Sequence, residues 1–240
     1  MAPYTDAVSK ELLPIADVPV IEYNLRYLEE SGIKKVYVVL GEGKEQIVRY
    51  VKDGRRLNLD VAYLFQEMKQ GAGTAKAVEV AKPWINQDFI VVYGDAFFHP
   101  GSFMKDMIRF HSEKGSAATI GLYGVEDPRR FGVVKVDAEG RVLDLVERPS
   151  LKQAEPFKTD RVYLVNSGPL IFAPIVFSYI EKTGLSPDGE YWITDTVKLM
   201  LRDRQPVQGF RIASEVFWRD VGTPKARLEA DEYALRTHSR

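Results

Sequence analysis

The sequence predicts an α/β fold in which a wound, mixed sheet carries flanking helices and a small antiparallel insert. Apolar runs of strand length alternate with amphipathic segments of helix length, which is typical of a sheet covered by helices. In the middle of the chain, two short strand-like runs flank a turn at residues 137–140 in FGVVKVDAEGRVLDLVERP. That pattern predicts an antiparallel hairpin.

The first half of the chain alternates helices and strands. Asp17 is a candidate N-cap for a helix over residues 17–31, which Gly32 would end. The run VYVVL at residues 36–40 is continuously apolar, so we expect a strand buried on both faces. The alternation continues with a helix at 42–52, a strand at 61–65, a helix at 74–81, a strand at 89–95 and a helix at 102–113.

The second half contains the hairpin and returns to alternation. The expected elements are a strand at 118–123, the hairpin, a strand at 162–172, helices at 174–182 and 190–204, a strand at 207–212 and a helix at 223–235. This order predicts a Rossmann-like wound mixed sheet in a single domain over residues 1–240.

Composition excludes several classes of function. The formal net charge of -1 gives no global attraction to nucleic acid or to anionic lipid. The chain has no cysteine, which excludes disulfides, thiolate zinc sites and a cysteine nucleophile and favours the cytoplasm. No apolar run reaches the roughly 20 residues of a membrane-spanning helix. The three histidines, His99, His111 and His238, lie far apart and show no metal-ligand spacing.

Two aspartates follow apolar segments. Asp95 ends the predicted strand FIVVYGD, and Asp220 lies in FWRDVGTP just before a glycine and a threonine. Ligands bind at the carboxyl ends of strands in open α/β sheets, and two carboxylates together with substrate phosphates suffice for Mg²⁺. Taken singly, each aspartate is better explained as an ordinary turn or loop residue, so the metal hypothesis depends on the pair.

The segment PYTDAVSKELLPIADVPVIEY, which contains Lys10, resembles the loop after the glycine-rich motif of the sugar-1-phosphate nucleotidylyltransferases, particularly the glucose-1-phosphate uridylyl- and thymidylyltransferases. Further segments agree with that family in order and spacing over almost the whole chain. They are QEMKQGAGTAKAV (base binding), YGDAFF (metal aspartate), FGVVKVD and VERP (sugar-binding strands), NSG (second sugar contact), GEYWITD (a family helix) and WRDVGT (second metal aspartate).

The resemblance implies a role for each matching residue. Gln66 and Gly71 would contact the base, Asp95 the nucleotide, and Gly132, Glu147 and Asn166 the sugar, while Lys10 and Arg148 would be catalytic cations on phosphate. Arg148 departs from the family pattern, which has lysine between the glutamate and the proline, and a guanidinium can clamp phosphate with two bonds. Without the family, Glu147 is equally readable as a solvent-facing partner of Lys135.

The implied reaction joins a hexose-1-phosphate to the α-phosphorus of a nucleoside triphosphate, UTP slightly favoured over dTTP, with Mg²⁺ on Asp95 and Asp220. The resemblance is compatible with a homo-oligomer, and the net charge and the lack of a long apolar run predict no nucleic-acid or membrane partner. A non-catalytic, sugar-nucleotide-binding regulatory homologue is the alternative. A glycosyltransferase is disfavoured because those enzymes usually have two aspartates separated by one residue. Here the positions two residues before and after Asp95 are Tyr93 and Phe97.

The beginning of the chain departs from a wound sheet, because a loop without a strand precedes the first helix. Family members start with a buried strand and a GxGxR loop, and MAPYT fits that pattern with Met1 directly after the arginine. We therefore expect an N-terminally incomplete domain with a misplaced start, poorly soluble or unstable as written and with negligible activity. A regulatory truncation is the alternative. No C-terminal β-helix domain is expected after VGTPKARLEADEYALR.

Overall fold

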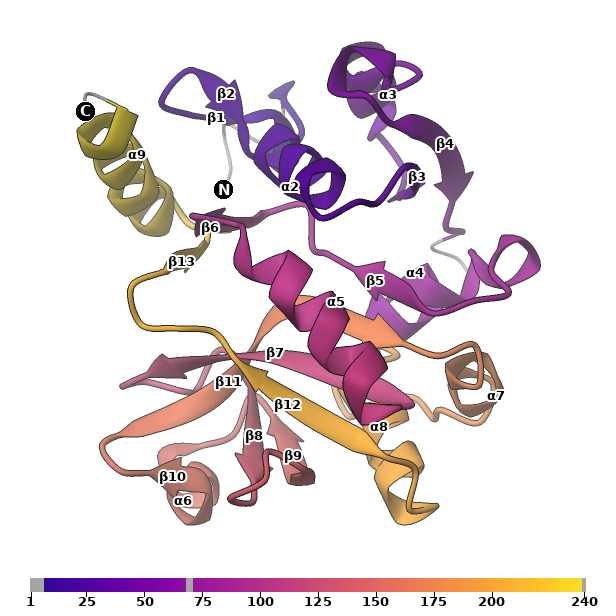
Figure 1. Ribbon diagram of the computed structural model, residues 1–240, viewed down its shortest axis with the longest axis vertical. Coiled ribbons are helices and arrows are strands. Elements are labelled where there is room, and N and C mark those ends of the chain that lie inside the picture. The colour runs from indigo at the N-terminus through magenta and orange to yellow at the C-terminus, as the bar shows by residue number, and fades with distance from the viewer. Residues whose placement is uncertain (1–6, 68–70, 239–240) are drawn as a thin grey trace. The chain divides into compact units, whose positions relative to one another are not determined.

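A computed structural model describes residues 7–67 and 71–238 (Figure 1). The residues that carry the MAPYT pattern, 1–5, lie outside this range. The chain divides into two compact units, taken separately below. The first comprises Met1–Phe65, Val92–Asp106 and Glu215–Arg240, and the second comprises Gln66–Val91 and Met107–Ser214.

The first unit contains a parallel β–α–β arrangement and two separate antiparallel pairs of strands. Its elements are the 3₁₀ helices η1 (Lys10–Leu12) and η2 (Arg55–Leu57), the strands β1 (Pro14–Ile15), β2 (Val18–Pro19), β3 (Lys35–Leu40), β4 (Asp60–Phe65), β6 (Ala96–His99) and β13 (Phe217–Asp220), and the helices α2 (Val20–Glu30), α3 (Glu45–Val51) and α9 (Pro224–His238). Helix α5 (Phe103–Lys114) begins in this unit and ends in the second.

Strands β3 and β4 are parallel and in register from Lys35↔Asp60 to Leu40↔Phe65, as the sequence predicts for strands joined by a helix. Their core is formed by Ile21, Leu25, Leu40, Ile47, Val51 and Leu59. Residues 36–39 are only half-buried, so the expected burial on both faces is wrong. Within the described ranges β3 pairs with β4 alone, so its other edge has no strand partner there.

Helix α2 begins later than the sequence suggests. Its N-cap is Pro19, without a side-chain capping bond, so the assignment of Asp17 as the cap is wrong. Residues 16–17 instead form the turn between β1 and β2, where Ala16 has φ 54° and its N–H donates to Asp231 Oδ1 at 2.6 Å. Gly32, with φ 90°, follows the helix as predicted, because its left-handed backbone suits glycine.

The strand predicted at 89–95 ends early, and a separate strand begins after Asp95. Strand β5 covers only Phe89–Val91, the chain turns at Gly94 and Asp95, and β6 then pairs antiparallel with β13. The Asn24 amide explains the break, because its Nδ2 donates to Ala96 O at 2.9 Å and to Tyr93 O at 3.3 Å.

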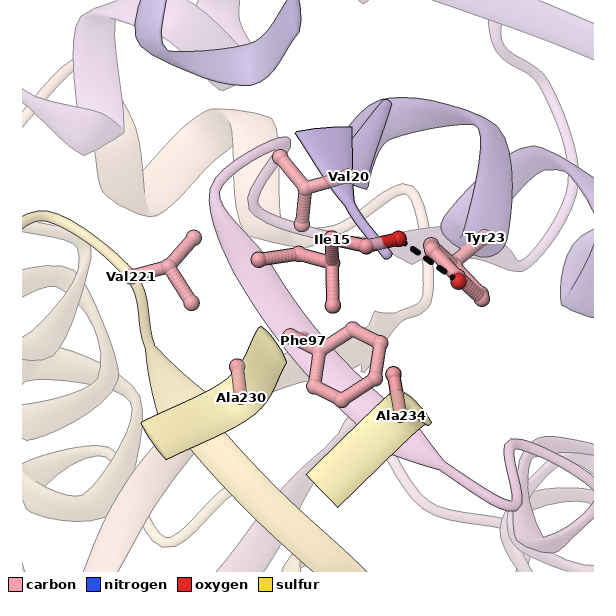
Figure 2. Packing of buried hydrophobic residues seen from close by; sticks show 7 residues of the cluster. All are labelled: Ile15, Val20, Tyr23, Phe97, Val221, Ala230 and Ala234. Atoms are coloured by element: carbon pink, nitrogen blue, oxygen red, sulfur yellow. Dashed lines mark hydrogen bonds between the residues drawn. The ribbon is translucent and has the colours of Figure 1, made fainter. Parts of the chain in front are cut away.

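A hydrophobic cluster holds β6 and β13 in place (Figure 2). It consists of Ile15, Val20, Tyr23, Phe97, Val221, Ala230 and Ala234. The Tyr23 and Phe97 rings meet edge to face at 5.0 Å, and the Tyr23 hydroxyl donates to Ile15 O at 3.0 Å. Burial of these side chains fixes β6, which follows Asp95, and β13, which ends at Asp220.

The second unit is built on a seven-stranded mixed sheet in the order β12-β7-β11-β8-β9, with β5 and β10 also paired to β11 (Figure 1). Only β12 and β7 run parallel. Its strands are β7 (Ala118–Val125), β8 (Gly132–Val136), β9 (Val142–Glu147), β10 (Lys158–Thr159), β11 (Val162–Phe172) and β12 (Val207–Arg211), and its α-helices are α4 (Thr74–Glu79), α6 (Leu151–Ala154), α7 (Val176–Ile180) and α8 (Ile193–Arg202). The remaining short helices are η4 (Lys82–Trp84) and η5 (Glu155–Phe157).

The antiparallel insert is the β8–β9 hairpin, with its turn at residues 137–140 as predicted. Asp137 Oδ1 accepts the backbone N–H groups of Glu139 and Arg141 and closes that turn. The hairpin extends the sheet, because Val133 of β8 pairs with Val165 of β11. None of the helices in the described part of the chain is long and apolar enough to cross a membrane.

Candidate active site

Asp95 and Asp220 lie side by side in the first unit. In the β6–β13 pair, Asp220 is opposite Ala96, and the N–H of Val221 donates to Asp95 O at 3.0 Å. Asp220 Oδ1 accepts the Gly222 N–H at 3.0 Å, which orients the carboxylate. Two carboxylates from distant parts of the chain are therefore neighbours on adjacent strand ends.

Lys10 completes this group. It lies on the short helix η1, not in a loop as expected, and its Nζ forms a short ion pair with Asp95 Oδ2. Burial disfavours the charged ammonium, but the charge and hydrogen bond of Asp95 together with the charges of Glu11 and Asp220 outweigh it, so the pKa of Lys10 is raised. The ammonium is therefore held by an acidic surrounding that favours cations.

Two further charged residues, Glu11 and Lys44, border the site, and neither was assigned a role from the sequence. Lys44 Nζ donates to Glu11 Oε2 at 2.7 Å and to Oε1 at 3.1 Å. A Cβ added at Gly94 would lie 3.2 Å from Glu11 Cγ, so a glycine before Asp95 leaves room for this side chain. The available signals were Gly94 itself and the lysine in GEGKE.

In the second unit, Gly132 and Glu147 face each other across the β8–β9 hairpin. A Cβ at Gly132 would lie 2.7 Å from Glu147 Oε2, so only glycine leaves space for the carboxylate. Burial raises the pKa of Glu147. Lys135 lies opposite Asp144, which does not support the alternative pairing with Glu147.

Arg148 follows Glu147 in an unusual backbone conformation. Its φ is 41°, in the left-handed region, and its N–H donates to Phe131 O at 3.1 Å. The guanidinium lies over the Trp192 ring, with Cζ 4.5 Å from the ring centroid, and its Nη1 is 3.6 Å from Asp188 Oδ2. The Trp192 indole N–H donates to both Asp188 oxygens, at 3.0 and 3.1 Å.

The segment that resembles the base-binding loop is joined to the segment before α8. Gln66 Nε2 donates to Gly73 O at 3.3 Å. Tyr191 exchanges backbone bonds of 2.9 Å with Ala72 and Ala75, and a Cβ at Gly71 would lie 2.6 Å from the Tyr191 ring. Residues 68–70 of the predicted segment are outside the described range. Tyr191 is therefore the neighbour of this segment, and the motifs of the sequence did not indicate that contact.

Asn166 lies at an irregularity of β11, where the register with β7 shifts between Asn166 and Leu170. Its Oδ1 accepts the Gly168 N–H at 3.1 Å, and Gly168 has φ 114°. The local turn fixes the orientation of the Asn166 amide.

The structure thus brings the predicted residues together in two groups. Lys10, Asp95 and Asp220 belong to the first unit, and the second unit holds Gln66, Gly71, Gly132, Glu147, Arg148 and Asn166. Among the described residues, no three His, Cys, Asp or Glu side chains gather as a metal site of their own. The first group offers two carboxylates and a cation, and the second offers a buried carboxylate, an amide and a guanidinium.

Known proteins resemble this chain along its length. It is 34% identical to the low-salt glycan biosynthesis nucleotidyltransferase Agl11 of Haloferax volcanii, over 100% of this chain and 64% of that protein. It is 31% identical to a glucose-1-phosphate thymidylyltransferase of Streptomyces griseus, over 99% of this chain and 63% of that protein. The chain therefore spans somewhat less than two thirds of the length of these relatives.

A solved UDP-glucose pyrophosphorylase complexed with UDP-glucose matches with a TM-score of 0.83 at 21% identity, covering 99% of this chain and 94% of that one. This likeness confirms the predicted α/β fold with a mixed central sheet. The profile of the nucleotidyl transferase family matches residues 1–237. With its motifs in family order and a match over nearly its whole length, the chain belongs to the nucleotidyl transferase family.

Proposed function

We propose that the protein transfers a nucleotidyl group from a nucleoside triphosphate to a hexose-1-phosphate, giving a nucleoside-diphosphate sugar and pyrophosphate. The observation that carries the proposal is the grouping of Asp95, Asp220 and Lys10 in the first unit. Such a group suits phosphoryl chemistry, in which catalysis is mainly positioning and neutralisation of charge.

The donor set fits Mg²⁺. Asp95 and Asp220 supply two hard oxygen ligands on neighbouring strand ends, and Mg²⁺ takes one or two carboxylates and fills its other positions with water and phosphate oxygens. The ammonium of Lys10 on Asp95, with its pKa raised in part by Asp220, supports the view that this pair attracts a cation. Mg²⁺ held there would neutralise charge on the reacting phosphate.

The protein's own residues supply the rest of the chemistry. Lys10 stays protonated at neutral pH, since its pKa is raised, and its ammonium would meet phosphate oxygens of the triphosphate. Arg148 would neutralise the phosphate of the incoming sugar phosphate, so that two anionic groups can approach. No general base is required, because a phosphomonoester oxygen is already a nucleophile at neutral pH.

Glu147 and Asn166 would orient the sugar. The Glu147 carboxylate can accept hydroxyl protons in the space that Gly132 leaves, and the Asn166 amide can both donate and accept. Gln66 and Gly71 would face the base. UTP and dTTP are the proposed donors, and the thymidylyltransferase relative of S. griseus supports a pyrimidine.

The test is an assay of pyrophosphate release by the natural protein, expressed from its own coding sequence. Each of UTP and dTTP is supplied with glucose 1-phosphate and Mg²⁺, and the sugar nucleotide is identified by mass. Binding of sugar nucleotide without turnover would instead identify the regulatory homologue. Transfer of glucose from the sugar nucleotide to an acceptor would identify a glycosyltransferase.

A further inference from the structure

Arg148 stands where the sugar phosphate is proposed to bind, yet an arginine on an exposed hairpin end does not hold one orientation by itself. Its side chain is 53% exposed and has many rotamers, so ordering it on binding costs conformational entropy. Two neighbours before helix α8 restrict it, although neither belongs to the residues assigned above. They are Trp192, directly before α8, and Asp188, in the preceding loop.

Trp192 offers its ring as a platform. The guanidinium carbon is 4.5 Å from the ring centroid, within the range of a cation–π contact. A planar guanidinium can stack on an aromatic face while its N–H groups stay directed outward along the plane, whereas an ammonium has no such plane. The departure from lysine at position 148 and an indole at position 192 therefore complement each other.

Asp188 fixes the platform. Both of its carboxylate oxygens accept the Trp192 indole N–H, at 3.0 and 3.1 Å. The same carboxylate lies 3.6 Å from Arg148 Nη1, which is an ion pair without close hydrogen-bond geometry. Asp188 thus orients the ring directly and holds the guanidinium only weakly, so an incoming dianion can displace it.

The backbone points to the same arrangement. Arg148 has φ 41°, a conformation that costs a non-glycine residue free energy and persists where the surroundings determine it. Its N–H donates to Phe131 O across the hairpin, which anchors this conformation and aims the side chain. The backbone of Arg148, the ring of Trp192 and the carboxylate of Asp188 therefore all restrict the same guanidinium.

Resting on the proposed function, we infer that Trp192 and Asp188 are positioning residues that hold the Arg148 guanidinium ready for the phosphate of the hexose-1-phosphate, with Asp188 as the counter-ion that this phosphate replaces. The platform makes position 148 selective for a dianionic phosphate. Nucleotide binding does not depend on it.

The test measures dissociation constants of the natural protein for glucose 1-phosphate and, separately, for UTP by calorimetry. Trp192→Leu should weaken glucose 1-phosphate about five- to tenfold and leave UTP within about twofold. Trp192→Phe keeps the aromatic face and should recover most of the loss, which a purely structural role of the indole would not explain. Trp84→Leu, the same change at a 55% exposed tryptophan, is the matched control and should change neither constant.

A double-mutant cycle shows whether Arg148 and Trp192 act together on the affinity for glucose 1-phosphate or independently. Arg148→Lys should weaken glucose 1-phosphate several-fold in the wild type but less than about twofold in Trp192→Leu, because the stack is already lost there. If the two losses simply multiply, or if Trp192→Leu weakens UTP equally, the inference is wrong. Melting temperatures of the variants show whether each one is folded, and Trp192→Phe keeps the test open if Trp192→Leu is not.

Substitutions of Asp188 test the inference through the direction in which the affinity for glucose 1-phosphate changes. Asp188→Asn keeps an oxygen for the indole N–H and removes the competing charge, so glucose 1-phosphate should bind about two- to threefold more tightly. Asp188→Ala removes the anchor as well and should bind more weakly than Asp188→Asn. Equal affinities of the two variants would overturn the role of Asp188. If the unmutated protein binds neither glucose 1-phosphate nor another hexose-1-phosphate, the proposed function itself fails. If it binds glucose 1-phosphate and the affinity does not change on substitution of Asp188 or Trp192, only this inference is overturned.

Discussion

The side-chain amide of Asn24 donates to the backbone oxygen of Ala96 at 2.9 Å, directly after Asp95. The same nitrogen is 3.3 Å from Tyr93 O, so one buried amide on helix α2 binds both ends of the turn that carries Asp95. Asn24 is only 4% exposed, and water cannot readily replace these bonds.

We expect Asn24→Ala to lower kcat about tenfold while leaving the KM for glucose 1-phosphate within about twofold, since the turn loses its anchor but the second unit is untouched. Steady-state kinetics and a thermal melt check this. Asn24→Ser, which restores one shorter donor, should recover part of the rate. A parallel rise of KM would show that Asn24 does not act through Asp95.

Replacement of either site carboxylate should abolish turnover with little effect on folding. Asp95→Asn and Asp220→Asn each should lower kcat about 100-fold or more, because a neutral amide is a poor ligand for Mg²⁺ and a poor partner for Lys10. The melting temperature should stay nearly unchanged. Asp60→Asn, at an exposed strand start, is the control. Normal turnover of Asp95→Asn would contradict the site.

Glu147 gives a prediction with a defined pH dependence. Burial raises its pKa above the usual 4.5, so the folded state favours the protonated form, and its contribution to stability is lost as pH rises from below 4.5 through the folded pKa. Glu147→Gln should therefore raise the melting temperature at pH 7, and the gain should shrink as pH falls below 4.5. Binding of glucose 1-phosphate should weaken at the same time.

Melting curves of Glu147→Gln and the wild type between pH 4 and 7 provide the measurement. Glu139→Gln, at the exposed tip of the same hairpin, is the control for binding. A variant that is less stable at pH 7 would mean that the charged carboxylate is a structural partner, and the sugar-binding role would lose its support.

The ion pairs of Glu22 should make the stability of the first unit sensitive to acid. Its side chain is 3% exposed, and although burial alone would raise the pKa, hydrogen bonds from Arg56, Tyr50 and Arg26 lower it to about 2. A lowered pKa means that the stabilisation is complete above pH 4.5 and is lost as pH falls toward 2. Glu22→Gln should lower the free energy of unfolding at pH 7 by about 2–3 kcal/mol.

Urea titrations at pH 7 and pH 3 measure this effect, and the difference between Glu22→Gln and the wild type should be smaller at the lower pH. Glu232→Gln removes an exposed pair with Arg236 at 3.8 Å and should change little at either pH. A constant difference across the two pH values would show that packing, and not charge, explains the loss.

The edge of β3 that has no strand partner in the described ranges can be tested with an added strand. Residues 36–39 are half-buried, and within residues 7–67 and 71–238 only β4 pairs with this strand. An apolar strand and a glycine-rich loop placed ahead of Met1 should pair with this edge and raise both solubility and transferase activity. Residues 1–240 alone, assayed beside that protein, should show negligible turnover, and an ordinary rate would overturn the idea.

Local sequence patterns were sufficient to predict most of the helices and strands. The turn at residues 137–140 joins β8 and β9 and sets their register, so the hairpin is predictable from a single short stretch of sequence. Gly32 likewise marks the end of α2. Both features depend on a few neighbouring residues, and sequence reasoning handles such features well.

Non-local contacts account for what the sequence did not predict. The turn after β5 is bonded to Asn24, about 70 positions earlier, and β6 pairs with β13 near the other end of the chain. Tyr191 meets Gly71 only after folding. No periodicity or motif within one of these segments predicts its contact with the other. The role of a residue such as Asn24 is therefore apparent only from the folded structure.

The joined loops around Tyr191 have a consequence for how substrate preference can change. Tyr191 is bonded through its backbone to Ala72 and Ala75, and its neighbour Trp192 supports Arg148. A substitution that enlarges Gly71 or Gly73 to admit another base must displace Tyr191, since an added Cβ would lie 2.6 Å or less from it. That displacement would move the ring under the guanidinium. On the proposed function, Tyr191 would link the choice of base to the sugar-phosphate side, and a change of donor nucleotide at Gly71 or Gly73 would require compensating changes near Trp192.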